Sequence, residues 1–180
     1  DSVMLAVHGQ ARRSAAVVVA VGPHQLPRAF ASEVMTRSPA LAAAVDALQT
    51  LDYEPIVTVW LGYAEASPLP QRVARLDDAP GQWVFDRQDV LDRAAPAPAR
   101  PAIRQLLAVV ISTHDHHLQL AHAELAQRVD AQLRRLRREL PPCVWSWVVA
   151  ERRATSACTP ERARPAGPRF GSGVYVACDY

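Results

Sequence analysis

Runs of apolar residues separated by short polar stretches dominate the start of the chain. The apolar runs Val3–Val7 and Ala15–Val21 flank the polar stretch HGQARRS, and this pattern predicts a β-hairpin. Because the second run is continuously apolar, we expect a strand that is buried on both faces. Gly22 and Pro23 should end that strand, and Pro23 suits the first turn of a helix that runs through Phe30 or beyond.

Two later segments have the residue pattern of helices. Ser38 has the side chain of an N-cap for the segment PALAAAVDALQTL that follows it. Apolar residues then recur every three or four positions between His117 and Glu139, and this stripe predicts the longest helix of the chain. Pro141 and Pro142 should stop it.

The middle and the end of the chain are rich in predicted strands. Residues Glu54–Tyr63 alternate, with Val57, Val59 and Leu61 expected on one face and Ile56, Thr58 and Trp60 on the other. The Pro/Ala-rich residues 92–102 and most of residues 152–172 read as loops. Further strands are predicted at Arg72–Leu76 and Gln82–Arg87, which flank the turn DDAPG, and at Leu106–Ser112, Val144–Glu151 and Gly173–Ala177.

These elements predict an α+β fold, with helices packed on or beside a mixed, largely antiparallel sheet, tending to α/β if outer strands join a parallel sheet. The chain is 49% hydrophobic and 21% charged, which is typical of a globular protein. Its net charge is +2, from 20 basic and 18 acidic residues, so no overall field favours nucleic acid as a partner.

The cysteines and the chain ends limit the setting in which the protein works. Cys143, Cys158 and Cys178 are far apart and odd in number, so neither a zinc site nor a disulfide framework is indicated, and we expect a reducing, cytoplasmic setting. No stretch approaches the ~20 apolar residues of a spanning helix. The start has no pattern of a signal peptide, and the end falls on a predicted strand, so we expect a fragment.

Two polar clusters have a functional and a structural interpretation. The run His114–His117 (HDHH) offers metal ligands, but neighbouring strand residues point to opposite faces, so a polar loop is favoured and no metal is expected. The basic run Arg134–Glu139 complements the dipole at a helix end as a solvated surface. Its alternative role is contact with anionic lipid at the inner membrane.

Several longer strings carry a family resemblance. The strings LDYEPIVTVWLGY, PGQWVFDR, LLAVVIS and ERRATSACTPERARP, in this order, together resemble the squalene-associated FAD-dependent desaturases. Hydroxysqualene dehydroxylases of bacterial hopanoid synthesis belong to that family, within the amine-oxidase and phytoene-desaturase flavoproteins. The resemblance implies a C-terminal portion in which residues 1–37 and 153–180 belong to an FAD-binding domain and residues 38–152 form a substrate-binding domain.

The resemblance implies FAD contacts at strand ends. Asp179 stands where the family has an aspartate that accepts a hydrogen bond from the flavin ribityl chain, a role that suits a carboxylate. The family keeps glycine where this chain has Cys178, and the family's dinucleotide fingerprint GxGxxG does not occur in these 180 residues, so we expect the 180-residue chain alone to be flavin-free and inactive. The other implied FAD contacts are Val7, Gly22, Pro23 and Ala177.

A cavity for an apolar triterpene is also implied. Trp83 and Phe85 would line it, and Trp60 and Trp145 are further candidates, although aromatic residues at strand spacing more often belong to an ordinary core. Arg153, Thr159 and Pro160 lie in the segment that in the family runs between the substrate cavity and the flavin.

The resemblance implies that the intact enzyme uses reduced FAD to convert hydroxysqualene into squalene. Alternatives within the same class are desaturation of a carotenoid precursor and oxidation of an amine or a porphyrinogen. An alternative of another class is a non-catalytic or degenerate lipid-binding domain. The sequence offers no candidate for the acid that would protonate the departing hydroxyl group.

Overall fold

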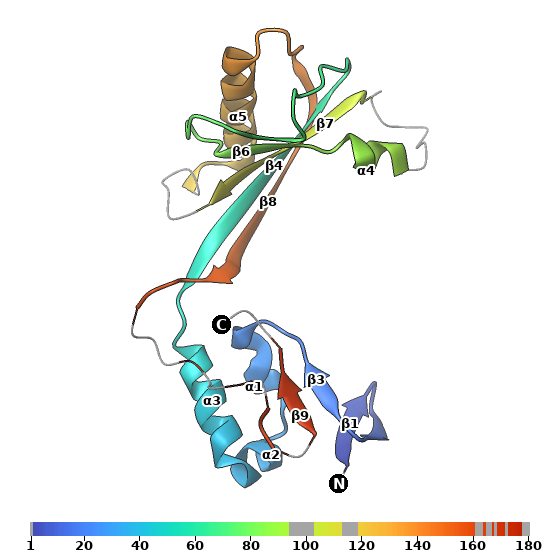
Figure 1. Ribbon diagram of the computed structural model, residues 1–180, viewed down its shortest axis with the longest axis vertical. Helices are drawn as coiled ribbons and strands as arrows, with labels where there is room; N and C mark the ends of the chain where they lie inside the picture. Colours follow the sequence, from blue (N-terminus) through green and yellow to red (C-terminus); the bar gives the residue numbers. More distant parts are fainter. Residues whose placement is uncertain are drawn as a thin grey trace. The chain divides into compact units, whose positions relative to one another are not determined.

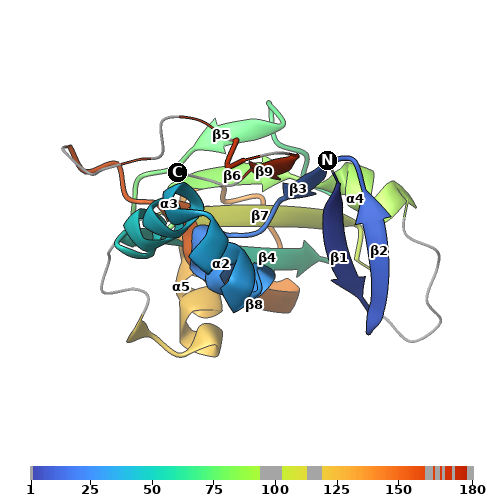
Figure 2. The same ribbon diagram turned by 90° about the horizontal axis from the view of Figure 1, so that it is seen from below.

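The computed structural model describes residues 2–93, 103–112, 119–160, 164, 167, 169–171 and 173–177. The chain forms two compact units (Figures 1 and 2). Unit 1 is Asp1–Tyr53 with Thr155–Tyr180, and unit 2 is Glu54–Ala154. The division therefore lies 16 residues after the boundary predicted at residue 38, because the helix that follows Ser38 packs in the core of unit 1.

Unit 1 begins with a hairpin whose second strand differs from the predicted one. Strand β1 (Val3–Val7) pairs antiparallel with the polar strand β2 (Gln10–Ser14), and His8 and Gly9, both with positive φ, form the turn. The apolar run forms strand β3 (Val17–Val19), which pairs in parallel with β9 (Val174–Val176). A two-residue turn leaves β2 beside β1, so the apolar run pairs with a strand from the other end of the chain.

The predicted burial of β3 on both faces is wrong. Val18 is 62% exposed, whereas Val19 packs against the core of unit 1 and Val176 of β9 is buried in it. The reason is that β3 and β9 make a two-stranded sheet, and the core of unit 1 covers only one of its faces.

Two helical segments of unit 1 begin at the residues that the sequence predicts. Pro23 opens the 3-10 turn η1 (Pro23–Gln25), which continues into α1 (Leu26–Ala29). A separate short helix, α2 (Ser32–Arg37), precedes α3 (Pro39–Gln49), and the Ser38 hydroxyl accepts a hydrogen bond from the Leu41 amide at 3.4 Å. The core that these helices bury consists of Leu26, Leu41, Val45, Leu48, Leu51 and Val176.

Unit 2 is a five-stranded antiparallel sheet with one long helix against it (Figure 1). The predicted α+β class with a largely antiparallel sheet is therefore confirmed. The strands lie in the order β5-β6-β7-β4-β8. Their bounds are Val73–Arg75 for β5, Trp83–Asp86 for β6, Gln105–Ser112 for β7, Tyr53–Tyr63 for β4 and Cys143–Ser156 for β8; helices α4 and α5 span Gln88–Arg93 and His122–Leu136.

Alternation along β4 determines which face of the sheet meets α5. Val57, Val59 and Leu61 are buried in the core of unit 2, as the sequence predicts, and they pair with the apolar strand β7. The stripe of α5 covers this face through buried Leu125, Val129 and Leu133. We call this side of the sheet the helix face and the opposite side the open face.

Two predicted boundaries differ from the structure. Helix α5 spans His122–Leu136 and is therefore shorter than the predicted helix His117–Glu139. It ends before the two prolines because the chain turns at Arg137 and returns buried Leu140 to the core. Strand β8 continues to Ser156 through residues predicted as loop, because it pairs with the long strand β4. The predicted loop 92–102 lies mostly outside the described residues.

Two buried glutamines attach loops to the framework of unit 2. Gln132 of α5 accepts a hydrogen bond from the Gly81 amide at 2.6 Å and donates one to the Gly81 carbonyl at 2.9 Å. Gln105 of β7 likewise accepts from the Ser67 amide at 2.9 Å and donates to its carbonyl at 2.7 Å. Each amide side chain thus satisfies both polar groups of one backbone residue, as a neighbouring strand would do.

We predict that Gln132→Leu lowers the free energy of unfolding by about 2 kcal/mol, because the buried Gly81 amide and carbonyl lose their partners. Urea denaturation followed by circular dichroism measures this loss. Gln127→Leu on the same helix is the matched control and should change stability by less than about 0.5 kcal/mol. Equal losses in both variants would show that the two bonds to Gly81 do not matter.

Candidate functional site

Unit 1 brings the carboxyl ends of its two parallel strands together. Strand β3 pairs with β9 so that Val19 lies opposite Val176, and the Ala177 amide donates to the Val19 carbonyl at 3.0 Å. Gly22 and Pro23 follow the end of β3, and Ala177 follows the end of β9. Three of the residues predicted near the cofactor therefore follow adjacent strand ends, the edge at which ligands bind in parallel α/β sheets.

The turn at Gly22 and Pro23 is held by hydrogen bonds from within unit 1. The Gln49 side chain donates to the carbonyl of buried Pro23 at 2.7 Å, and the Gly22 amide donates to Gln25 Oε1 at 3.1 Å. A Cβ atom at Gly22 would lie 2.8 Å from Cε1 of His24, so glycine allows the ring of His24 to fold back over the turn.

Gly173 is a further residue on which this strand pair depends, and the sequence analysis missed its role. Its carbonyl accepts a hydrogen bond from the Val17 amide at 2.8 Å, which begins the β3–β9 pairing. Its φ is +75°, and a Cβ atom there would lie 2.6 Å from the carbonyl oxygen of Ala15. The signal in the sequence is a glycine directly before the last strand.

The other residues predicted near the cofactor are not gathered at these strand ends. Val7 belongs to the separate β1–β2 sheet, where it pairs with Gln10 beside the turn. Thr159 and Pro160 follow β8, and the Thr159 amide donates to the Ala157 carbonyl at 2.9 Å. Asp179 and Cys178 lie outside the described residues.

The aromatic residues predicted to line a cavity meet on the open face of unit 2. Val84 is buried under α5, so its neighbours Trp83 and Phe85 point to the opposite side of the sheet. Trp83 pairs with Val110 and Phe85 with Ala108 of β7. The same two β7 residues pair with Thr58 and Trp60 of β4, so the three aromatic residues share one face.

Trp83 is 42% exposed, which differs from the ordinary core position that was the alternative interpretation. The guanidinium of Arg75 lies over its ring, 5.4 Å from the centroid. Asp78 fixes this guanidinium through an ion pair, with Arg75 Nη2 and Asp78 Oδ2 2.6 Å apart. The bond to Arg75 holds the pKa of the exposed Asp78 below its usual value. The ring therefore has a defined orientation at one margin of the open face.

Arg153 lies elsewhere, at an exposed position in the second half of β8. Its backbone amide donates to Glu151 Oε1 at 3.0 Å. The prediction that Arg153, Thr159 and Pro160 adjoin a substrate cavity stays a prediction.

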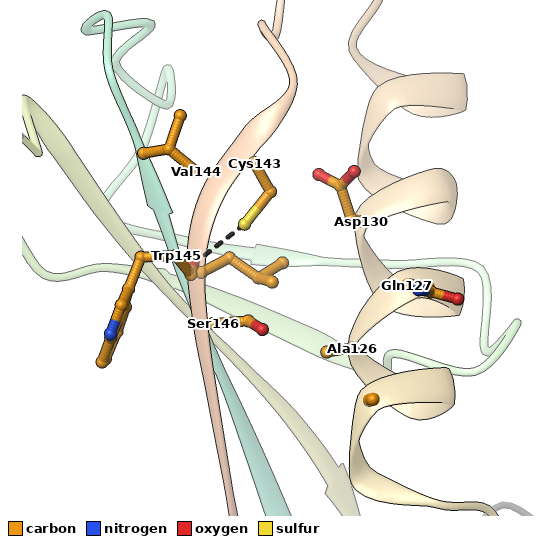
Figure 3. A pocket seen from close by; sticks show the side chains of 9 residues that line it. Ala126, Gln127, Asp130, Cys143, Val144, Trp145 and Ser146 are labelled. Atoms are coloured by element: carbon orange, nitrogen blue, oxygen red, sulfur yellow. Dashed lines mark hydrogen bonds between the residues drawn. The ribbon is translucent and has the colours of Figure 1, made fainter. Parts of the chain in front are cut away.

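A groove that the sequence analysis did not predict lies between α5 and β8 (Figure 3). Its volume is about 260 Å³. Asp130 of α5 points toward Cys143 of β8, and its carboxylate accepts a hydrogen bond from the Tyr63 hydroxyl at 3.0 Å. The Cys143 thiol donates to the Trp145 carbonyl at 2.9 Å, and burial raises its pKa. The lining residues are Leu61, Ala123, Ala126, Gln127, Asp130, Cys143, Val144, Trp145 and Ser146.

The basic run at the end of α5 is largely paired with carboxylates. Arg134 lies 3.6 Å from Asp130, Arg135 lies 2.5 Å from Asp77, and Arg137 lies 2.6 Å from Glu139. These pairs fit the solvated helix end that was the structural interpretation of the run. Contact with anionic lipid stays a prediction.

Neither a metal site nor a membrane span is found in the described part of the chain. Its residues contain no group of three or more His, Cys, Asp or Glu side chains arranged to hold a metal ion. The candidate ligands His114–His117 lie outside these residues. Over the same residues, no helix is both long enough and apolar enough to cross a membrane.

We predict that stability falls above about pH 10 in a way that depends on Tyr63. Burial and the Asp130 carboxylate raise the pKa of folded Tyr63, whereas an unfolded tyrosine ionises near pH 10. The contribution is therefore complete below about pH 10 and is lost as the pH rises above it. In urea titrations between pH 7 and 11, Tyr63→Phe should start about 1 kcal/mol less stable and fall less steeply. All 20 basic residues are arginine, so no lysine titrates in this range. If stability fell equally with pH in the unchanged chain and in Tyr63→Phe, Tyr63 would not be the cause of the pH dependence.

Comparison with protein families identifies one family over most of the chain. The sequence model of the flavin-containing amine oxidoreductase family matches residues 2–157 of this chain. Among solved structures, an Exiguobacterium sp. 255-15 protein provisionally named a protoporphyrinogen oxidase is similar, with a TM-score of 0.56 and 12% identity over 98% of this chain. An oxidoreductase from Methanosarcina mazei has a TM-score of 0.54 and 14% identity over 95% of this chain. The match covers 39% of each of those chains, and no curated protein sequence matches this one.

Proposed function

Because the chain belongs to the flavin-containing amine oxidoreductase family, we propose that its protein is an FAD-dependent oxidoreductase that acts on a long apolar isoprenoid. The specific reaction proposed is the reductive dehydroxylation of hydroxysqualene to squalene. The observation that carries the substrate class is the apolar, aromatic open face of unit 2, with Trp83 exposed on it. The structural relatives, at 12% and 14% identity, support the fold alone.

The strand ends of unit 1 suit a bound dinucleotide. Gly22, Pro23 and Ala177 follow the adjacent carboxyl ends of β3 and β9, and small residues there let a cofactor approach the backbone. We propose that they border FAD and that Asp179, two residues after Ala177, accepts a hydrogen bond from it. When bound in its reduced form, FAD would supply the hydride that replaces the hydroxyl group of the substrate.

The open face suits a hydrocarbon better than an amine. Charged side chains on this face, such as Arg75 beside Trp83, lie at its margins. Its centre is formed by apolar side chains and one threonine: Ile56, Thr58, Trp60, Trp83, Phe85, Ala108 and Val110. A protonated amine there would need a carboxylate, carbonyl groups or free aromatic ring faces, and the ring of Trp83 already has the Arg75 guanidinium over it. Unit 2 is therefore proposed as the substrate-binding part and unit 1 as the FAD-binding part. Carotenoid desaturation fits the same face, whereas amine or porphyrinogen oxidation fits it less well.

A second candidate function is binding of an apolar lipid without catalysis. It is motivated by Cys178, which stands where the resembling family keeps glycine close to the flavin, and by the lack of a GxGxxG fingerprint in these 180 residues. A catalytic flavoenzyme and a lipid-binding domain share the apolar open face, so only cofactor and turnover measurements separate them.

The direct test incubates the full-length protein with hydroxysqualene and reduced FAD and measures squalene by gas chromatography and mass spectrometry. We expect Trp83→Ser to raise KM about tenfold with little change in kcat, because lost apolar contact weakens substrate and transition state equally. Leu136→Ser, a similar change on the exposed side of α5, is the control and should alter neither constant. Turnover of an amine or a porphyrinogen without squalene formation would contradict the proposal.

The 180-residue chain itself should be purified without flavin. Its absorbance spectrum between 350 and 500 nm, roughly the range of the flavin bands, should show no bound cofactor, since Cys178 replaces glycine. A stoichiometric yellow cofactor would show that the cysteine is tolerated and would weaken the non-catalytic candidate.

A further inference from the structure

Strand β8 is the last strand of its sheet and has an unusually apolar edge. In the described part of the chain, only β4 pairs with it. Charged residues and prolines are the usual means by which edge strands avoid pairing with other chains. Residues 143–150 (CVWSWVVA) contain neither. Trp147 is 59% exposed, and Val149 is exposed on the same face. These features are typical of a strand whose free edge is covered by another strand.

The groove between α5 and β8 lies beside this edge, on the helix face. Figure 3 shows Cys143 and Ser146 pointing toward α5, whereas Trp145 points away from it. The only ionised group that lines the groove is the Asp130 carboxylate, which is 16% exposed. Arg134 lies 3.6 Å from it and is itself half exposed, so this pairing is loose. The groove would therefore favour a cationic side chain that reached it from the edge of the sheet.

We propose that β8 pairs with β8 of a second copy of this chain, antiparallel about a twofold axis at Val148. The two sheets would then continue into one, and the apolar stretch would no longer form an exposed edge. In this register Trp147 lies opposite Val149 of the second copy. That is an aromatic and β-branched cross-strand pair of the kind that stabilises antiparallel strands.

The same register matches charges. Alternation is regular only from Ser146 onward, where even-numbered side chains share the helix face with Ser146 and buried Val148, and this places Arg152 on the helix face. Pairing about Val148 brings Arg152 of the second copy alongside residues 144–146, at the mouth of the groove that contains Asp130. By symmetry, Arg152 of the first copy reaches the groove of the second. Arg153 points to the open face and takes no part.

This double match favours a second copy over an unrelated strand. The free edge offers apolar residues at its centre, an acidic groove at one end and an arginine at the other. An antiparallel copy of the same strand places its arginine at the acidic end. A strand of another sequence could form the backbone hydrogen bonds of the edge, but it would not in general match both the apolar centre and the charged ends.

The test is the oligomeric state of the full-length protein by sedimentation equilibrium, with Trp147→Lys and Arg152→Glu as variants. We expect a dimer whose dissociation constant rises about tenfold or more in each variant, because every substitution acts twice across the twofold axis. Arg153→Glu is the matched control: it makes the same change in charge one residue along and should alter the constant less than about twofold.

A compensating substitution guards against misfolding as the cause of a monomer. Gln127 lines the groove beside Asp130, so Gln127→Arg combined with Arg152→Glu gives the new carboxylate a cationic partner and should restore part of the lost affinity. A chain that sediments as a monomer at about 100 µM, a dimer that Trp147→Lys leaves intact, or an equal effect of Arg152→Glu and Arg153→Glu would each overturn the proposal. Failure of the double variant to recover would overturn the assigned register.

Discussion

The antiparallel pairing of β4 with β7 is the constraint on which unit 2 depends. Because side chains alternate along paired strands, the pairing of Val59 with Val109 sends one set of residues to the helix face and the other to the open face. Helix α5 covers the first set and forms the core. The second set carries Trp60 and is continued by Trp83 and Phe85 of β6. One register therefore determines both the core and the proposed substrate surface.

Polar groups within unit 2 are satisfied by side chains where strands end. Gln132 and Gln105 each bond both backbone groups of a loop residue, and the Tyr63 hydroxyl bonds the Asp130 carboxylate. Buried polar atoms are costly without partners, so these contacts fix the loops at well-defined positions. The bonds of Gln132 hold the loop before β6, and the strand that follows carries Trp83. The orientation of the open-face aromatics thus depends on contacts made on the helix face.

Unit 1 depends on a pairing between strands from opposite ends of the chain. Strand β3 has only three residues, and its parallel partner β9 is more than 150 residues later. Gly173 lets the chain enter β9 close to the Ala15 carbonyl, and the Ala177 amide closes the pair at Val19. The residues proposed to border FAD gain their proximity from this contact, so the cofactor edge exists only where both ends of the chain are folded together.

Local pattern alone determined much of this protein: the alternation of β4, the stripe of α5, the Ser38 cap, and the turn at Gly22 and Pro23. Each depends on neighbours within a few residues, where side-chain period and turn chemistry act directly. Tertiary structure alone decided that β2 rather than β3 completes the first hairpin, that Val18 is exposed, and that Gln132 binds Gly81. It also opened the groove at Asp130 and left β8 at the edge of its sheet. Those outcomes depend on which distant segment supplies a strand's partner, and the pairing energy of two strands depends on the contacts of the whole sheet rather than on either strand's own residues.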